Sequence, residues 1–218
     1  MTAAPLPLPV ARAAFADTLD GLSALLRHLD DTTLHARSRC HGRLAADVLA
    51  HLHLGLVEML AGFPARTVRP ADVDLATYWS APPPGAAQPG WAHERFARAV
   101  AAAYARPSGQ LAHVARTVRG LRRLVADLDA PYRLEFQGHV LEVADFVGTW
   151  VVEVAVHHLD MTVALPDVPA PPASGLALVR ETVARPAGRD AVAGWDDDTA
   201  LALAATGREP GMVPVLGQ

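Results

Sequence analysis

The spacing of apolar residues along the chain predicts a mainly helical protein. Between residues 10 and 28 the apolar side chains recur every three or four positions, which is the spacing of one helix face. Comparable patterns predict further long helices, separated by glycine, proline and acidic stop signals. These lie at 44–61, 91–105, 110–129 and 144–165, and shorter helices are predicted at 176–184 and 199–205.

The segments between these helices have different patterns. Residues 32–41 alternate enough to predict an extended connector, and residues 64–90 contain six prolines, which predicts a long surface loop. Two short alternating runs flank Gln137-Gly138 and predict a small β-hairpin that leads into the last long helix.

These elements together predict an all-α protein. We expect residues 1–165 to form an up-down four-helix bundle with a small β-hairpin before the fourth helix. Residues 166–218 are expected to form a linker and a short helical C-terminal extension that packs on the bundle. A chain of 218 residues is long enough for one substantial hydrophobic core.

Composition and charge exclude several classes of function. The 19 basic residues are all arginine, so the chain has no lysine for Schiff-base chemistry. A net charge of −4 gives no electrostatic signature of nucleic-acid binding. Cys40 is the single cysteine, which excludes an intrachain disulfide and predicts a small buried thiol. No membrane span or export signal is evident, so we expect a cytoplasmic protein.

The helix predicted at 144–165 contains the strongest candidate for chemistry. Glu153 and His157 are four residues apart, and such residues lie on the same helix face. Most Glu/His pairs of this kind face solvent, but here the surrounding residues are apolar, and an unpaired buried glutamate would be costly. A divalent metal ion would pair with both side chains.

Neighbouring residues offer further candidates. Asp160 follows His157 by three residues and could accept the second ring N–H of this histidine, or it could be a solvated residue in the last helical turn. In the second predicted helix, His51 and His53 point about 200° apart, so only one of them can reach a shared site. The apolar pattern leaves open which of the two faces inward.

Two motifs in this order resemble a known family. The segment from Cys40 to Leu52 contains Asp47-Val48-Leu49-Ala50-His51-Leu52, and about a hundred residues later the chain reads Glu153-Val154-Ala155-Val156-His157-His158-Leu159-Asp160. Across residues 10–165 the chain resembles the mycothiol-dependent maleylpyruvate isomerase family, which belongs to the DinB-like metal-binding four-helix bundles. Arg43 stands where this family commonly has tryptophan, and most of the usual C-terminal domain is expected to be missing.

The resemblance implies a specific site. His51, Glu153 and His157 would hold zinc or another divalent metal ion, with Asp160 supporting His157, and His53 would lie outside the site. Chemistry would take place at the metal, with mycothiol as co-substrate. We therefore expect an enzyme that activates a low-molecular-weight thiol for transfer to, or isomerisation of, a small electrophilic substrate.

Two alternatives use the same scaffold. One is a metal enzyme without a thiol, which carries out hydrolysis, isomerisation or a specialised biosynthetic step. The other is a non-catalytic bundle with a structural metal, which would normally have four protein ligands. In each case we expect no nucleic-acid or membrane partner, and a monomer or homodimer.

Overall fold

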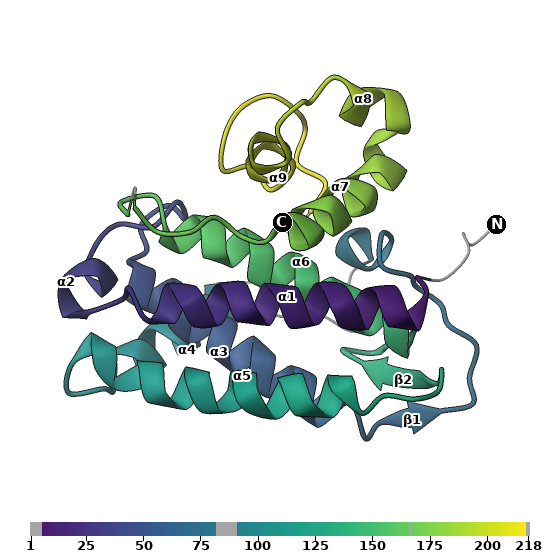
Figure 1. The fold of residues 1–218 in the computed structure, drawn as a ribbon, viewed down its shortest axis with the longest axis horizontal. Helices are drawn as coiled ribbons and strands as arrows, with labels where there is room; N and C mark the ends of the chain where they lie inside the picture. The colour runs from purple at the N-terminus through teal and green to yellow at the C-terminus, as the bar shows by residue number, and fades with distance from the viewer. Residues whose placement is uncertain (1–5, 82–90, 166, 217–218) are drawn as a thin grey trace.

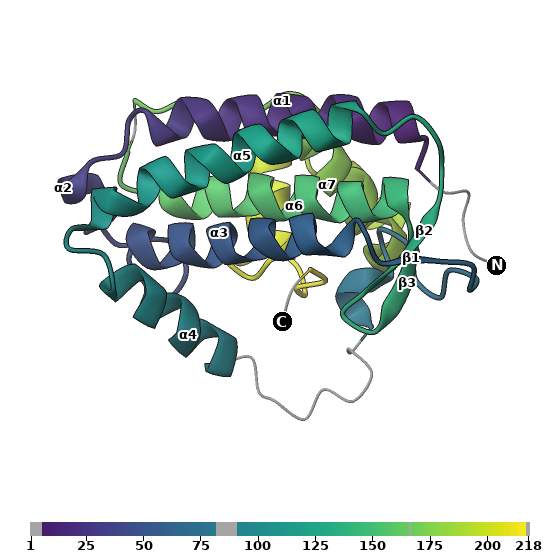
Figure 2. The same ribbon diagram turned by 90° about the horizontal axis from the view of Figure 1, so that it is seen from below.

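Four long helices lie side by side and form the body of the protein. The computed structural model describes residues 6–81, 91–165 and 167–216. The four helices run roughly parallel to one another across Figures 1 and 2 and confirm the predicted all-α four-helix bundle. They are α1 (Leu8–Leu26), α3 (Ala45–Gly62), α5 (Leu111–Ala126) and α6 (Val143–Met161).

Helix α6 is the centre of this bundle. Each of its residues is buried except Glu153, which is partly exposed. The helix packs against α1 and α3 in the bundle and against two helices of the C-terminal region. A helix that is apolar around most of its circumference is expected at such a buried position. Polar residues on α6 are therefore enclosed by protein on most sides.

A small antiparallel sheet lies at one end of the bundle (Figure 2). The predicted hairpin consists of β2 (Arg133–Phe136) and β3 (His139–Glu142). Its turn has a positive φ at both Gln137 (49°) and Gly138 (83°), a conformation typical of two-residue hairpin turns. The sequence did not predict β1 (Arg66–Thr67), which pairs with β2 through two residues of the proline-rich segment.

The predicted extended connector at 32–41 is wrong in its first part. A short helix, α2 (Asp31–Leu34), begins there. The Asp30 carboxylate accepts a hydrogen bond from the Thr33 backbone N–H, and the Thr33 side chain bonds back to the Asp30 backbone. This capping box stabilises a helical turn that the alternating pattern conceals. Further along, Arg37 pairs with Leu44 as an isolated β-bridge.

Other elements complete the connections between the long helices. The proline-rich segment contains the short 3₁₀ helix η1 (Tyr78–Ser80), and its residues 82–90 lie outside the described residues. Helix α4 (Trp91–Ala102) packs on α3, and η2 (Pro107–Gln110) precedes α5. The predicted helix at 91–105 is thus an addition beside the bundle, as Figure 2 shows.

The C-terminal region packs along one side of the bundle (Figure 1). It contains α7 (Ala173–Ala187), α8 (Arg189–Ala193) and α9 (Asp198–Ala205). Helix α7 contacts α1 and α6, and α9 contacts α6. Gly21 allows the start of α7 to approach α1 closely, because a Cβ atom there would lie 2.5 Å from Cδ of Pro172. These contacts bring the last part of the chain close to α6.

Helix α3 is long and apolar enough to cross a membrane by length and composition alone. Half of its length is buried inside the protein, and it packs on α4, α5 and α6. The core helices of soluble proteins have the same length and composition.

Candidate metal centre

The structure brings the three predicted metal ligands together between α3 and α6. Nε2 of His157 lies 3.1 Å from Oε2 of Glu153, and the rings of His51 and His157 are edge to face with centroids 4.9 Å apart. One ligand atom from each residue lies within 4.8 Å of the other two. His51 comes from α3, whereas Glu153 and His157 come from successive turns of α6.

Close packing of the two helices explains why side chains from both reach one point. Gly55 lies one turn beyond His51, and a Cβ atom at this position would be 2.8 Å from Cζ3 of Trp150. The missing side chain therefore allows the Trp150 ring to lie against the backbone of α3. The spacing of four residues on α6 then places the imidazole of His157 one turn along the same helix face from the carboxylate of Glu153.

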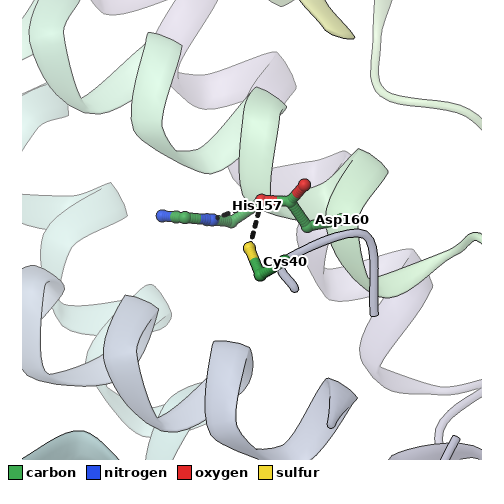
Figure 3. Close-up of side chains that lie close together, drawn as sticks. All are labelled: Cys40, His157 and Asp160. Carbon is green, nitrogen blue, oxygen red and sulfur yellow. Dashed lines mark hydrogen bonds and ion pairs between the residues drawn. The ribbon is translucent and has the colours of Figure 1, made fainter. Parts of the chain in front are cut away.

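Asp160 lies behind His157, on the side away from Glu153. Its Oδ2 atom is 2.9 Å from Nδ1 of His157 (Figure 3). The carboxylate side chain is completely buried. A solvated aspartate is thereby excluded. With Nδ1 engaged in this hydrogen bond, Nε2 is the ring nitrogen that faces Glu153.

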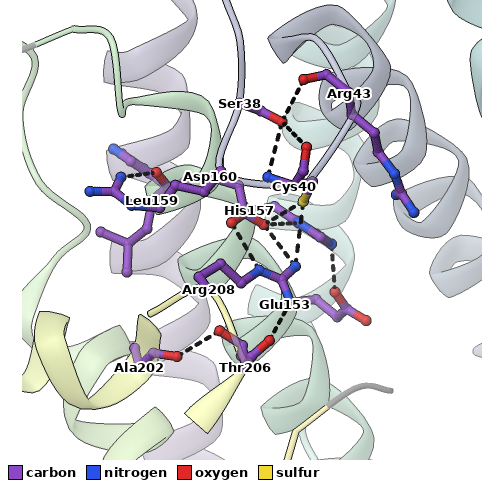
Figure 4. Close-up of polar contacts among 12 residues, drawn as sticks. Ser38, Cys40, Arg43, Glu153, His157, Leu159, Asp160, Ala202, Thr206 and Arg208 are labelled. Atoms are coloured by element: carbon purple, nitrogen blue, oxygen red, sulfur yellow. Dashed lines mark hydrogen bonds and ion pairs between the residues drawn. The ribbon is translucent and has the colours of Figure 1, made fainter. Parts of the chain in front are cut away.

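The C-terminal region contributes an arginine to the same network. Arg208 binds Asp160 with two hydrogen bonds, from Nε to Oδ1 and from Nη2 to Oδ2, both 3.0 Å long (Figure 4). The thiol of Cys40 also donates to Oδ2 of Asp160, at 3.2 Å, and Arg208 Nη2 lies 3.5 Å from the sulfur. The carboxylate of Asp160 is thus fixed from three directions.

Burial and the surrounding charges have opposite effects on the pKa values of this network. Burial lowers the pKa of His157, but hydrogen bonds to Asp160, Cys40 and Glu153 outweigh it and raise this pKa well above its usual value. Burial raises the pKa of Glu153 and of Asp160, yet their bonds to His157 lower both values on balance. Without a metal ion, His157 is therefore a cation between two carboxylates.

Two other histidines in or next to these motifs, His53 and His158, point away from the three candidate ligands. Nε2 of His53 lies 3.0 Å from the hydroxyl of Thr117 on α5. His158 is buried, and its Nε2 lies 2.8 Å from the backbone oxygen of Pro169. Each ring has a structural partner away from Glu153. In the structure His51, rather than His53, lies beside Glu153 and His157, although its role as a metal ligand stays a prediction.

Two cavities open next to the three candidate ligands. The larger has a volume of about 570 Å³, and the smaller has a volume of about 190 Å³. Among the described residues, those that line both cavities are His51, Glu153 and His157. These three side chains therefore lie where the two cavities adjoin.

The donor set fits a divalent metal ion. Two imidazole nitrogens and one carboxylate oxygen are the protein ligands of one class of catalytic zinc site, which keeps its remaining position for water or substrate. Ligands about 2.0–2.2 Å from a tetrahedral ion lie roughly 3–4 Å from one another. The 3.1 Å separation of the His157 and Glu153 atoms agrees with this spacing. Asp160 is the expected hydrogen-bond partner for Nδ1 of His157, the ring nitrogen that faces away from the candidate metal position.

Sequence analysis did not identify two members of the network. Cys40 was expected to be a buried apolar residue, whereas the structure places it half-buried at the wall of the larger cavity, in contact with Asp160. Arg208 is 48 residues from Asp160 in the sequence. In the sequence, Gly207 beside it indicates a turn, and the structure gives this glycine a positive φ of 71°. A turn signal does not indicate which residue Arg208 contacts.

Comparison with known proteins agrees with this geometry. A family profile described as the mycothiol maleylpyruvate isomerase N-terminal domain matches residues 15–162, which include the three candidate ligands and Asp160. No curated protein and no solved structure matches the chain. Because the profile covers more than half of the sequence, the chain belongs to the mycothiol maleylpyruvate isomerase N-terminal domain family, a DinB-like metal-binding family.

Proposed function

We propose that this protein is a metal-dependent enzyme that activates a low-molecular-weight thiol, such as mycothiol, for transfer to or isomerisation of a small electrophile. The metal ion, zinc in our proposal, would be held by His51, Glu153 and His157. The observation that carries this proposal is the meeting of these three side chains where two cavities adjoin. Membership of the family supports both the metal and the thiol.

A divalent ion with three protein ligands supplies Lewis acidity at its remaining position and so lowers the pKa of a thiol that coordinates there. The chain's own residues prepare this position. Asp160 holds the Nδ1 proton of His157, which leaves Nε2 as the nitrogen that would lose its proton and bind the metal ion. Arg208 in turn holds Asp160 with two hydrogen bonds, so the orientation of the carboxylate is fixed before any ligand binds.

The larger cavity suits the thiol. Its volume lies within the range of ordinary small-molecule sites, about 300–1,000 Å³. Positively charged side chains at its wall would favour a sulfur that carries negative charge over the neutral thiol. Apolar side chains provide contact area for the rest of the molecule. The basic residues are Arg39, Arg43 and Arg208, and the apolar ones include Val152, Val156 and Leu216.

The proposal is tested by mass spectrometry of reaction mixtures. Zinc-loaded protein, mycothiol and a panel of small electrophiles should give thiol conjugates or isomerised products faster than the same mixtures with metal-stripped protein. The Glu153→Gln variant is the site control, and His53→Ala is the matched control on α3. Turnover that persists without any thiol would favour the thiol-independent metal enzyme. Absence of metal-dependent turnover with and without thiol would contradict both enzymatic functions.

A further inference from the structure

We propose that the smaller cavity is a binding site for a small neutral or cationic group that donates hydrogen bonds, such as an amide, amine or amidine, and that it disfavours carboxylates. It is lined by residues of α3, α6, η1 and the hairpin turn. The inference rests on the proposed function only in assigning the thiol to the larger cavity, which makes this smaller cavity the site of the electrophile.

The charges around the two cavities differ. The larger cavity has three arginines in its wall. None of the described residues that line the smaller cavity is an arginine, and its charged groups other than histidine are Glu58 and Glu153. The potential in the smaller cavity is therefore more negative than in the larger one. Opposite charges within a few ångströms attract and like charges repel, so this difference selects ligands by charge.

A chain of hydrogen bonds at the edge of the smaller cavity engages both of its hydroxyl protons. The hydroxyl of Tyr78 donates to Oε1 of Gln137 at 2.8 Å, and Nε2 of Gln137 donates to Oε2 of Glu58 at 3.3 Å. The hydroxyl of Thr149 donates to the backbone oxygen of Phe146 at 2.8 Å. The protons of both hydroxyl groups are thus already used.

The remaining hydrogen-bonding capacity of this wall determines the ligand chemistry. The Tyr78 oxygen can still accept, and so can Oε1 of Gln137 and both carboxylate oxygens of Glu58. The unused donors are fewer: one is the second N–H of the Gln137 amide, and the other is the indole N–H of Trp150, which is buried without a partner among the described residues. A ligand with N–H groups would satisfy these acceptors, whereas a carboxylate would place further lone pairs against them. Burial raises the pKa of Tyr78, and the negative charges of Glu153 and Glu58 raise it further. This direction agrees with a site that disfavours anions.

The size of the smaller cavity limits the ligand. A volume of about 190 Å³ is below the roughly 300–1,000 Å³ of ordinary small-molecule sites, so only a compact group fits. Glu58 and Gln137 are exposed, whereas Leu52, Thr149 and Trp150 are buried, so the cavity runs from solvent toward the three candidate ligands. A compact electrophile could therefore place its donor group at the outer end and its reactive carbon near His157.

The test uses three probes of nearly equal shape and different charge: benzamidine, benzamide and benzoate. Each is added to the metal-free full chain, and backbone amide NMR shifts are recorded. Gly55 lines the smaller cavity and not the larger, and Gly207 lines the larger and not the smaller. These two glycine amides therefore report where each probe binds. The measurement requires neither metal nor thiol, so its outcome is independent of whether the proposed function is correct.

We expect benzamidine and benzamide to shift Gly55, and benzoate to shift Gly207 more than Gly55. The Glu58→Gln variant should reduce the preference for benzamidine over benzoate at Gly55 by about tenfold, because it removes one charge and keeps the side-chain shape. Glu181→Gln, on the exposed surface of α7, should leave the preference unchanged. The proposal is overturned if benzoate binds at Gly55 as tightly as benzamidine, if no probe shifts Gly55, or if Glu58→Gln leaves the preference unaltered.

Discussion

Replacing Asp160 with asparagine would change the charge of a buried group without changing its shape. The carboxylate now accepts hydrogen bonds from His157, Arg208 and Cys40. Asparagine has one acceptor oxygen and one donor NH₂ group. If its oxygen faces His157, its NH₂ group faces the guanidinium of Arg208, and the reverse orientation leaves His157 without an acceptor. The Asp160→Asn variant therefore loses at least one of these interactions in either orientation.

The expected magnitudes follow from the burial of each partner. Breaking a fully buried ion pair costs about 3–5 kcal/mol. The Asp160 side chain is wholly buried, but that of Arg208 is 18% exposed, so water relieves part of the penalty and we expect a loss of about 2–4 kcal/mol. For a chain of this size that is a fall in Tm of roughly 5–15 °C. Zinc affinity should fall about 10- to 100-fold, as is typical when the partner of a metal-binding histidine is lost.

A second substitution separates the two effects. Arg208→Met removes the cation that Asp160→Asn leaves unpaired, and it keeps a side chain of similar length. The double variant should regain much of the lost stability, because both partners of the pair are then uncharged. It should not regain zinc affinity, since His157 still lacks its carboxylate partner. The assays are thermal unfolding followed by circular dichroism and competitive zinc titration against a chromogenic chelator.

Two outcomes would refute this reasoning. If Asp160→Asn lowers Tm and leaves zinc affinity unchanged, Asp160 stabilises the fold and does not tune His157 as a ligand. Recovery of zinc affinity in the double variant would likewise show that the Arg208 charge, rather than the Asp160 contact, had lowered it.

Three further predictions concern other residues. Alanine at His51, Glu153 or His157 should abolish tight zinc binding, whereas His53→Ala should not; equal losses in metal analysis of the His53 and His51 variants would contradict the assignment. Zinc affinity should fall as pH decreases, by about tenfold per pH unit for each proton that the ligands must release on binding. The fall should start above the usual histidine range, because the pKa of His157 is raised. Zinc affinity that is independent of pH between 8 and 6 would be inconsistent with this. Burial of Asp145 raises its pKa to about 6. The folded state therefore binds more protons than the unfolded state between about pH 4 and 6, and stability is lost as pH rises through this window. Asp145→Asn should then stabilise the folded state at pH 8 by up to about 3 kcal/mol, measured as a higher Tm, and should have little effect near pH 4. An equal change in Tm at both pH values would disprove the link to ionisation.

The sequence predicted the bundle well because its strongest signals are local. Apolar spacing reflects which face of a helix is buried, and the long helices at both ends of the matched region follow it closely. The hairpin was predictable from Gln137-Gly138, since both positions need a positive φ. By contrast, α2 depends on side-chain capping by Asp30 and Thr33, and β1 on pairing with a strand more than sixty residues later.

The candidate site was predictable only in part. Glu153 and His157 share a helix face by their spacing, so local periodicity is sufficient to pair them. The choice between His51 and His53 depends on how α3 packs against α5 and α6, which apolar spacing did not decide. The contacts of Cys40 and Arg208 with Asp160 join residues 120 and 48 positions apart. Such contacts result from tertiary packing, and no local pattern encodes them.

The central claim is that His51, Glu153 and His157 hold a metal ion and leave one coordination position open for a thiol. Its most direct test is a titration of the cobalt(II)-substituted protein with mycothiol, followed by electronic absorption. We predict the visible bands of a four-coordinate cobalt(II) site in the wild-type protein, their loss in the His51→Ala variant, and a new sulfur-to-metal charge-transfer band on addition of the thiol. Unchanged spectra after the thiol is added, or identical cobalt spectra in the wild-type and His51→Ala proteins, would contradict the claim.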